Sequence, residues 1–233
     1  MSKPFKFKQF EIVQEANPQK VGTDSMLLGA WTSGNFTRIL DIGTGTGILA
    51  LMMAQKSTDS VVTAIEPNLE SYTEATTNFN KSKYSNRILS INAYLQDFGA
   101  MEKFDLIICN PPYFDGSYLS EDDNRNSARH QSTLRTDELY ECSADLLRED
   151  GRMNVVIPHS ALGEHLERAF DNDLYLQDIL ISLSPDGTKK RAFISLGFED
   201  IEPTEKTILV KDSNNKYSAE YIAMTKGFYL KDL

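Results

Sequence analysis

Short apolar runs alternate with amphipathic segments along most of this 233-residue chain. Seven apolar runs are typical of strands, at residues 38–42, 60–66, 88–93, 104–109, 153–157, 174–183 and 191–198. Apolar residues three or four positions apart predict helices at residues 46–56, 69–83, 137–148 and 160–170, the third of them stopped by Gly151. Because this alternation is typical of a parallel sheet covered on both faces, we expect a doubly wound α/β fold. The last two strands have no helix between them and should pair antiparallel.

A different pattern precedes the first predicted strand. Residues 5–21 alternate between apolar and charged side chains, and Asn17-Pro18 is a turn signal, so we expect a β-hairpin there. A short helix should follow, with Thr23 or Asp24 as its cap.

Composition and charge narrow the class of protein. Hydrophobic residues make up 40% and charged residues 25% of the chain, as in globular proteins. No apolar run approaches the roughly 20 residues of a membrane-spanning helix, and no signal-peptide pattern follows the N-terminal lysines. Cys109 and Cys142 lie in a predicted strand and a predicted helix, so we expect buried thiols in a reducing cytoplasm. The net charge of −10 argues against a polyanionic partner, unless local positive patches bind it.

Glycines follow the first predicted strand in the run Asp41-Ile42-Gly43-Thr44-Gly45-Thr46-Gly47, and the second strand ends at Glu66. Glycines let the backbone approach a ligand beside a helix N-terminus, and a carboxylate at the tip of the next strand can bind both ribose hydroxyls. This arrangement predicts a nucleoside cofactor. Gly45, Gly47 and Ala50 also match the dinucleotide pattern of NAD-dependent oxidoreductases, which stays an alternative, although it leaves Asp41 and Gly43 without a purpose.

The run D-x-G-x-G-x-G resembles the first motif of class I S-adenosylmethionine-dependent methyltransferases. This resemblance implies that the acidic residue orients the methionine end of the donor and that the glycines pass beneath it. Asp97, in Leu95-Gln96-Asp97-Phe98, resembles the acid that contacts the adenine in this family. The expected donor-binding residues are Thr23, Asp24, Asp41, Gly43, Gly45, Gly47, Glu66, Asp97, Phe98 and Asn110.

The fourth predicted strand is followed by Asn110-Pro111-Pro112-Tyr113. The lone pair of an amino group conjugated to a base is delocalised, so methylation must first make it available. The Asn110 side-chain oxygen and the Pro111 carbonyl can accept the two amino hydrogens, and Tyr113 can stack on a planar base. Pro112 keeps the turn rigid without a competing donor. No metal and no strong general base are needed if the methyl donor is a positive sulfonium, because its leaving group is neutral, and we expect no metal site.

This tetrapeptide resembles the amino-methyltransferases, and the whole chain resembles the bacterial tRNA1(Val) adenine-37 N6-methyltransferase family. The wider resemblance rests on Phe7-Lys8-Gln9-Phe10, Lys20-Val21-Gly22-Thr23-Asp24, Ala128-Arg129-His130 and the tail Gly227-Phe228-Tyr229-Leu230-Lys231. It implies a tRNA substrate, which an acidic protein would bind through local basic residues. The candidates are Arg125, Arg129, His130, Lys189, Lys190 and Arg191.

The expected organisation has two parts that form one monomeric protein without membrane contact. Residues 1–36 would be a hairpin and helix that cover the cofactor, and residues 37–233 a Rossmann-like domain with a mostly parallel, seven-stranded sheet and an antiparallel last strand. Three alternatives stay open: a methyltransferase acting on a protein glutamine amide, an NAD-dependent oxidoreductase, and a noncatalytic tRNA-binding module. The first usually carries a helical substrate domain ahead of the fold, and only 37 residues precede the first strand here.

Overall fold

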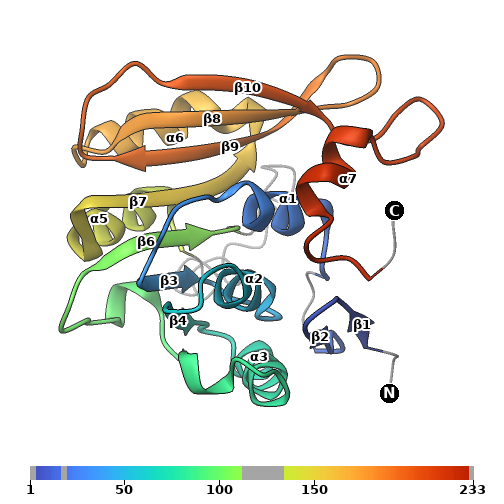
Figure 1. The fold of residues 1–233 in the computed structure, drawn as a ribbon. Coiled ribbons are helices and arrows are strands. Elements are labelled where there is room, and N and C mark those ends of the chain that lie inside the picture. Colours follow the sequence, from blue (N-terminus) through green and yellow to red (C-terminus); the bar gives the residue numbers. More distant parts are fainter. Residues whose placement is uncertain (1–3, 17–19, 112–133, 231–233) are drawn as a thin grey trace, which may run out of the picture.

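An eight-stranded sheet forms the centre of the computed structural model, which describes residues 4–16, 20–111 and 134–230 (Figure 1). Its strand order is β10-β8-β9-β7-β6-β3-β4-β5. The strands are β3 (Arg38–Ile42), β4 (Val61–Ile65), β5 (Ile88–Ile91), β6 (Phe104–Cys109), β7 (Leu147–Pro158), β8 (Tyr175–Leu183), β9 (Lys189–Gly197) and β10 (Thr204–Leu209). Strands β5, β4, β3, β6 and β7 pair parallel, whereas β9 runs antiparallel to both β7 and β8. The predicted α/β class and the antiparallel pairing of the last two predicted strands are confirmed.

Helices cover both faces of the sheet. One face carries α1 (Thr23–Trp31), α2 (Ile48–Lys56), α3 (Leu69–Lys81) and α7 (Ala219–Thr225), and the other carries α5 (Thr136–Leu146) and α6 (Leu162–Phe170). Short 3-10 turns occupy Ser85–Arg87, Leu95–Asp97 and His159–Ala161. Successive residues of β6 show why both faces need cover, because Leu106 and Ile108 enter one core while Ile107 and Cys109 enter the other. None of the helices in the described ranges is long and apolar enough to cross a bilayer.

The N-terminal hairpin is shorter than its sequence pattern predicts. Its strands are β1 (Phe5–Lys6) and β2 (Glu11–Ile12), and Phe5 pairs with Ile12, so the chain reverses within residues 7–10. The turn expected at Asn17-Pro18 was therefore misplaced for this hairpin, and those two residues lie outside the described part of the chain. Phe7 bridges to Tyr229, which brings the N-terminal hairpin and the segment after α7 side by side (Figure 1).

Several predicted boundaries differ from the structure for local reasons. An eighth strand, β10, pairs parallel with β8 at the edge of the sheet; it was missed because only Ile208 in it is buried. The helix predicted to stop at Gly151 already ends at Leu146, and Gly151 lies within β7, next to an irregularity in its pairing with β6. Gly22, not Thr23 or Asp24, is the N-cap residue of α1.

The order of the parallel strands creates a crevice at one edge of the sheet. From β3 the chain continues to β4 and then β5 on one side, whereas β6 lies on the other side of β3. Loops that leave the carboxyl ends of β3 and β6 therefore diverge, and ligands of open α/β sheets bind at such switch points. The glycine run follows β3 and Asn110 follows β6, so both flank this crevice.

Candidate active site

The glycine run forms a tight turn from β3 into α2. Gly43, Gly45 and Gly47 have φ angles of 65°, 56° and 84°, in the left-handed region that side chains rarely adopt. A Cβ atom at Gly47 would also lie 2.4 Å from the ring of Phe79. Glycine at position 47 therefore lets α3 pack against the turn, and it delays the start of α2 to Ile48 instead of the predicted position 46.

Side chains from neighbouring elements hold this loop from two directions. Glu66, at the end of β4, accepts a hydrogen bond from the backbone NH of Gly45 at 2.9 Å. From α3, Asn78 Nδ2 donates to the carbonyl oxygens of Thr46 and Val13, both at 2.9 Å. The same side chain accepts from the NH of Val13 at 2.9 Å. Asn78 thus fastens the segment that precedes α1 to the glycine loop.

Asp41, in β3, accepts hydrogen bonds from the glycine loop and from α2. Its side chain is fully buried, and Oδ2 accepts hydrogen bonds from Thr44 Oγ1 at 2.5 Å and from the NH of Ala50 at 3.1 Å. Its Oδ1 is buried with no hydrogen-bond partner among the described residues. Burial raises the pKa of this carboxyl from 3.8 to about 7, against the lowering effect of its hydrogen bonds. Asp41 does not line the cavity described next, so its direct contact with a donor stays a prediction.

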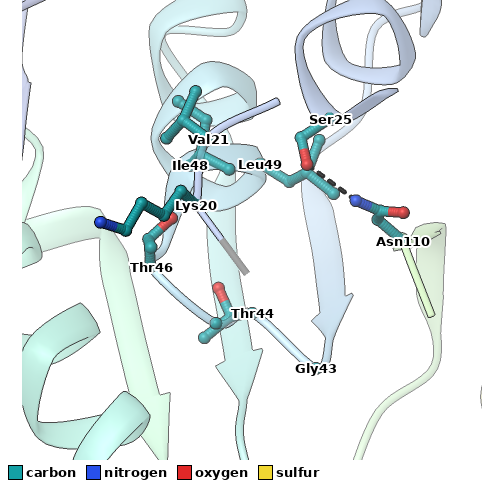
Figure 2. Close-up of a pocket in the computed structure, with 10 residues that line it drawn as sticks. Lys20, Val21, Ser25, Gly43, Thr44, Thr46, Ile48, Leu49 and Asn110 are labelled. Atoms are coloured by element: carbon teal, nitrogen blue, oxygen red, sulfur yellow. Dashed lines mark hydrogen bonds between the residues drawn. The ribbon is translucent and has the colours of Figure 1, made fainter. Parts of the chain in front are cut away.

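An open cavity of about 390 Å³, part of it open solvent, lies between the glycine loop, the start of α2 and the end of β6 (Figure 2). Val21, Ile48 and Leu49 provide apolar surface, and the loop and Asn110 provide polar groups. The complete lining is Lys20, Val21, Ser25, Gly43, Thr44, Gly45, Thr46, Ile48, Leu49 and Asn110. Among the expected donor-binding residues, Gly43, Gly45 and Asn110 line it. The other seven lining residues were not among the predicted donor-binding residues. Lys20 and Val21 belong to the motif Lys20-Val21-Gly22-Thr23-Asp24, whereas Ser25, inside α1, had no sequence signal of its own.

The other expected donor-binding residues do not line this cavity, and Glu66, Asp97 and Phe98 among them follow the carboxyl ends of β4 and β5. Glu66 is 8% exposed; its second oxygen accepts from the NH of Asn68 at 3.0 Å, and burial raises its pKa. Asp97 and Phe98 follow β5, where Asp97 is exposed. Because β3, β4 and β5 are parallel neighbours, these groups share one edge with the glycine loop. Thr23 and Asp24 begin α1.

Asn110 is held across the cavity from the glycine loop. Its Nδ2 donates to the hydroxyl of Ser25 at 2.8 Å, and its oxygen points away from Ser25 (Figure 2). Pro111 follows directly and is half-buried. The remaining residues of the predicted acceptor site and basic loop, namely Pro112, Tyr113, Arg125, Arg129 and His130, lie outside the described part of the chain.

Lys189, Lys190 and Arg191, the predicted RNA-binding residues that the structure describes, differ in their exposure and contacts. Lys189 and Lys190 are exposed at the start of β9. Arg191 is half-buried, and its Nε donates to Asp24 Oδ2 at 2.8 Å. Asp24 precedes the cavity residue Ser25, so this ion pair places Arg191 near the cavity.

Possible metal ligands and the two cysteines lie in the described ranges. No three His, Cys, Asp or Glu residues there are grouped so that they could hold a metal ion. Both cysteines are free: Cys109 is buried, which raises its thiol pKa, whereas Cys142 is only partly buried, contrary to expectation.

Comparisons with known proteins show the family of this chain. Residues 19–177 match the family model of the methyltransferase small domain. A tRNA1(Val) (adenine(37)-N6)-methyltransferase from Bacteroides fragilis is 40% identical over 240 residues, which span 99% of this chain and 100% of the relative. The chain belongs to this methyltransferase family. A second member, from Flavobacterium psychrophilum, is 36% identical over 97% of this chain and 99% of its own length.

The fold is also found among solved structures. A predicted O-methyltransferase from Agrobacterium tumefaciens superposes with a TM-score of 0.68 at 16% identity, covering 88% of this chain and 96% of that protein. This likeness supports the Rossmann-like fold alone. The resemblance seen in the N-terminal segment, the acceptor tetrapeptide and the tail is confirmed at the level of the family.

Proposed function

We propose that this protein transfers a methyl group from S-adenosylmethionine to the exocyclic N6 amine of adenine 37 in tRNA1(Val). The observation that carries the proposal is the position of Asn110 and Pro111 at the end of β6, across one cavity from the glycine loop. A group that orients an amine and a loop that suits a nucleoside cofactor thereby face the same space. The family membership given above supports the choice of tRNA as acceptor.

The cavity has the chemistry that such a donor needs. S-adenosylmethionine, when bound, supplies a methyl group on a positively charged sulfur, so that the departing group is neutral. The N-terminus of α2, which borders the cavity, suits its carboxylate, and Val21, Ile48 and Leu49 suit its apolar parts. Glu66 would accept hydrogen bonds from the ribose hydroxyls, and Asp97 and Phe98 would lie by the adenine. The left-handed glycines allow an approach that a Cβ would obstruct.

The acceptor amine would meet Asn110 and Pro111. The Asn110 side-chain oxygen and the Pro111 carbonyl oxygen each accept one amino hydrogen, which favours a pyramidal nitrogen whose lone pair faces the methyl group. These interactions are strongest as the transition state forms, so they lower the barrier more than they tighten binding. In the same proposal Tyr113 stacks on the base and Pro112 stiffens the turn.

tRNA binding would rest on concentrated positive charge, because the protein as a whole carries −10. Lys189 and Lys190 are the exposed candidates in the described part of the chain, and Arg125, Arg129 and His130 complete the proposed contact surface. The segment of residues 20–22 and α1 would cover the donor, with Lys20 and Val21 at the cavity wall. We further propose a cytoplasmic monomer that needs no metal.

The acceptor class is tested with a labelled methyl donor. Wild-type protein and an Asn110→Ala variant are incubated separately with bulk tRNA that lacks the modification and with a peptide-release factor. We expect label in N6-methyladenine from the tRNA, no label in the protein, and loss of nearly all transfer in the variant. Label in a glutamine amide would instead support the protein methyltransferase, and tRNA binding without any transfer would support the noncatalytic module. Tighter binding of NAD than of S-adenosylmethionine in a calorimeter would support the oxidoreductase.

A further inference from the structure

The proposed acceptor site depends on which way round the Asn110 amide lies. The oxygen and the nitrogen of an Asn side chain exchange places when the amide rotates by half a turn, and only the oxygen can accept a hydrogen bond. An amine that donates its hydrogens therefore meets an acceptor in one orientation and a competing donor in the other. In the structure Nδ2 of Asn110 faces a hydrogen-bond partner and the oxygen points away from it, so this bond holds the amide in the productive orientation.

Ser25 is this partner. Its Oγ accepts the hydrogen bond from Asn110 Nδ2 at 2.8 Å, and both residues line the cavity (Figure 2). Ser25 is 8% exposed, so water competes little for this bond. The two residues are 85 positions apart in sequence, and they join the first turn of α1 to the end of β6.

Helix α1 is held firmly enough to make Ser25 a fixed reference point. Met26 and Leu28, which point in different directions from the helix, have no exposed surface, so α1 is packed on more than one side. At its start, Asp24 forms the ion pair with Arg191 of β9. At its other end, the Lys56 ammonium donates to the carbonyl oxygens of Gly29, Ala30 and Thr32. Contacts at both ends of α1 thus fix the position of the Ser25 hydroxyl.

We propose that Ser25 is a positioning residue for methyl transfer, which fixes the Asn110 amide with its oxygen toward the acceptor amine. This inference rests on the proposed function for its kinetic consequence, but not for the hydrogen bond itself. Ser25 acts on the geometry of the transition state through Asn110. Its removal lowers kcat and leaves KM for tRNA and the affinity for S-adenosylmethionine nearly unchanged.

The kinetic test compares Ser25→Ala with Thr73→Ala, which removes an exposed hydroxyl from α3, remote from the cavity. We expect Ser25→Ala to lower kcat at least about tenfold, with KM and donor Kd within about twofold of the wild type, and Thr73→Ala to change none of these. In an Asn110→Asp background both oxygens can accept, so orientation no longer matters and Ser25→Ala should cost less than about twofold. Wild-type kcat, an equal loss in both backgrounds, or a lost donor affinity would overturn the proposal.

A second readout needs no substrate. In protein labelled with ¹⁵N-asparagine, the side-chain NH₂ signal of Asn110 is identified by its disappearance in Asn110→Ala. We expect Ser25→Ala to shift this signal and speed its exchange with water, and Thr73→Ala to leave it in place. An unchanged signal in Ser25→Ala would overturn the proposal even if tRNA proved not to be the substrate. A shifted signal together with an inactive wild type would support the positioning of Asn110 and contradict only the proposed function.

Discussion

Arg191 donates a hydrogen bond through Nε to Asp24 Oδ2 at 2.8 Å, although the two residues are 167 positions apart. This ion pair ties β9, which begins with the exposed Lys189 and Lys190, to the first turn of the helix that carries Ser25. A residue expected to bind RNA is therefore paired with one expected to bind the donor. Arg191 therefore differs from Lys189 and Lys190, because it makes a contact within the protein. Separate substitutions of Arg191 and of the two lysines can distinguish their effects.

Replacing Arg191 should lower the stability of the protein, because its side chain holds the first turn of α1. Both side chains of the pair are about a third exposed or less, so Arg191→Ala should lower the free energy of unfolding by up to about 1 kcal/mol. The double variant Asp24→Ala/Arg191→Ala should be no less stable than Arg191→Ala, because the pair is already broken. Urea unfolding measures this cycle, and strictly additive losses would show that the pair contributes nothing.

Replacing Lys189 and Lys190 should weaken tRNA binding without affecting the donor. Each lysine that truly contacts a phosphate contributes about 0.7 to the slope of log affinity against log salt on single-stranded RNA. Lys189→Ala/Lys190→Ala should lower both the affinity and the slope, measured by filter binding at several salt concentrations. Lys103→Ala, exposed just ahead of β6 and therefore at the opposite edge of the sheet, is the control. Wild-type affinity and slope in the double variant would assign these lysines to ordinary solvated surface.

Removing the Glu66 carboxylate should weaken donor binding. Two ribose hydroxyls would lose their acceptor, at a cost of about 1 to 3 kcal/mol in a calorimeter. Glu70→Ala, which removes an exposed carboxylate in the first turn of α3, should bind the donor like the wild type. Since Glu66 also accepts from the NH of Gly45, the unfolding midpoint is measured in parallel. Unchanged donor affinity would exclude Glu66 from the site.

Asp41 should make the stability of the fold depend on pH. Burial raises its pKa from 3.8 to about 7, so the folded protein binds the proton more tightly than the unfolded chain. The resulting stabilisation is complete below pH 3.8 and is lost as the pH rises to about 7, by an amount on the order of 4 kcal/mol. Asp41→Asn stays neutral and should show a smaller fall in the free energy of unfolding across this range. Parallel pH profiles for the two proteins would contradict the assignment.

Much of the fold could be predicted from sequence because buried strands carry their own signal. The strands from β3 to β9 have apolar runs, whereas β10 is an edge strand that buries Ile208 and leaves most of its side chains in water. Its pattern therefore resembles a polar loop. The hairpin turn was misplaced because residues 7–10 contain no Gly, Pro or Asn, and the burial of Phe7 and Phe10 stabilises it instead.

The candidate site was predictable where function imposes a local motif. The glycine run and Asn110-Pro111 are contiguous in sequence, so their types and spacing could be interpreted directly. The hydrogen bond of Ser25 with Asn110 and that of Asp24 with Arg191 join segments far apart in the sequence, and no local pattern predicts such contacts. The support of the loop by Asn78 is of the same kind, because it depends on how α3 packs.

The proposed function is tested most directly by locating the methyl group in the product. Unmodified tRNA1(Val) is incubated with the wild-type protein and S-adenosylmethionine, digested with a ribonuclease, and its fragments are sequenced by mass spectrometry. We expect one added methyl group, on N6 of adenine 37, and none when the RNA carries another base at that position. A methyl group at any other atom or nucleotide, or no methylated fragment at all, would contradict it.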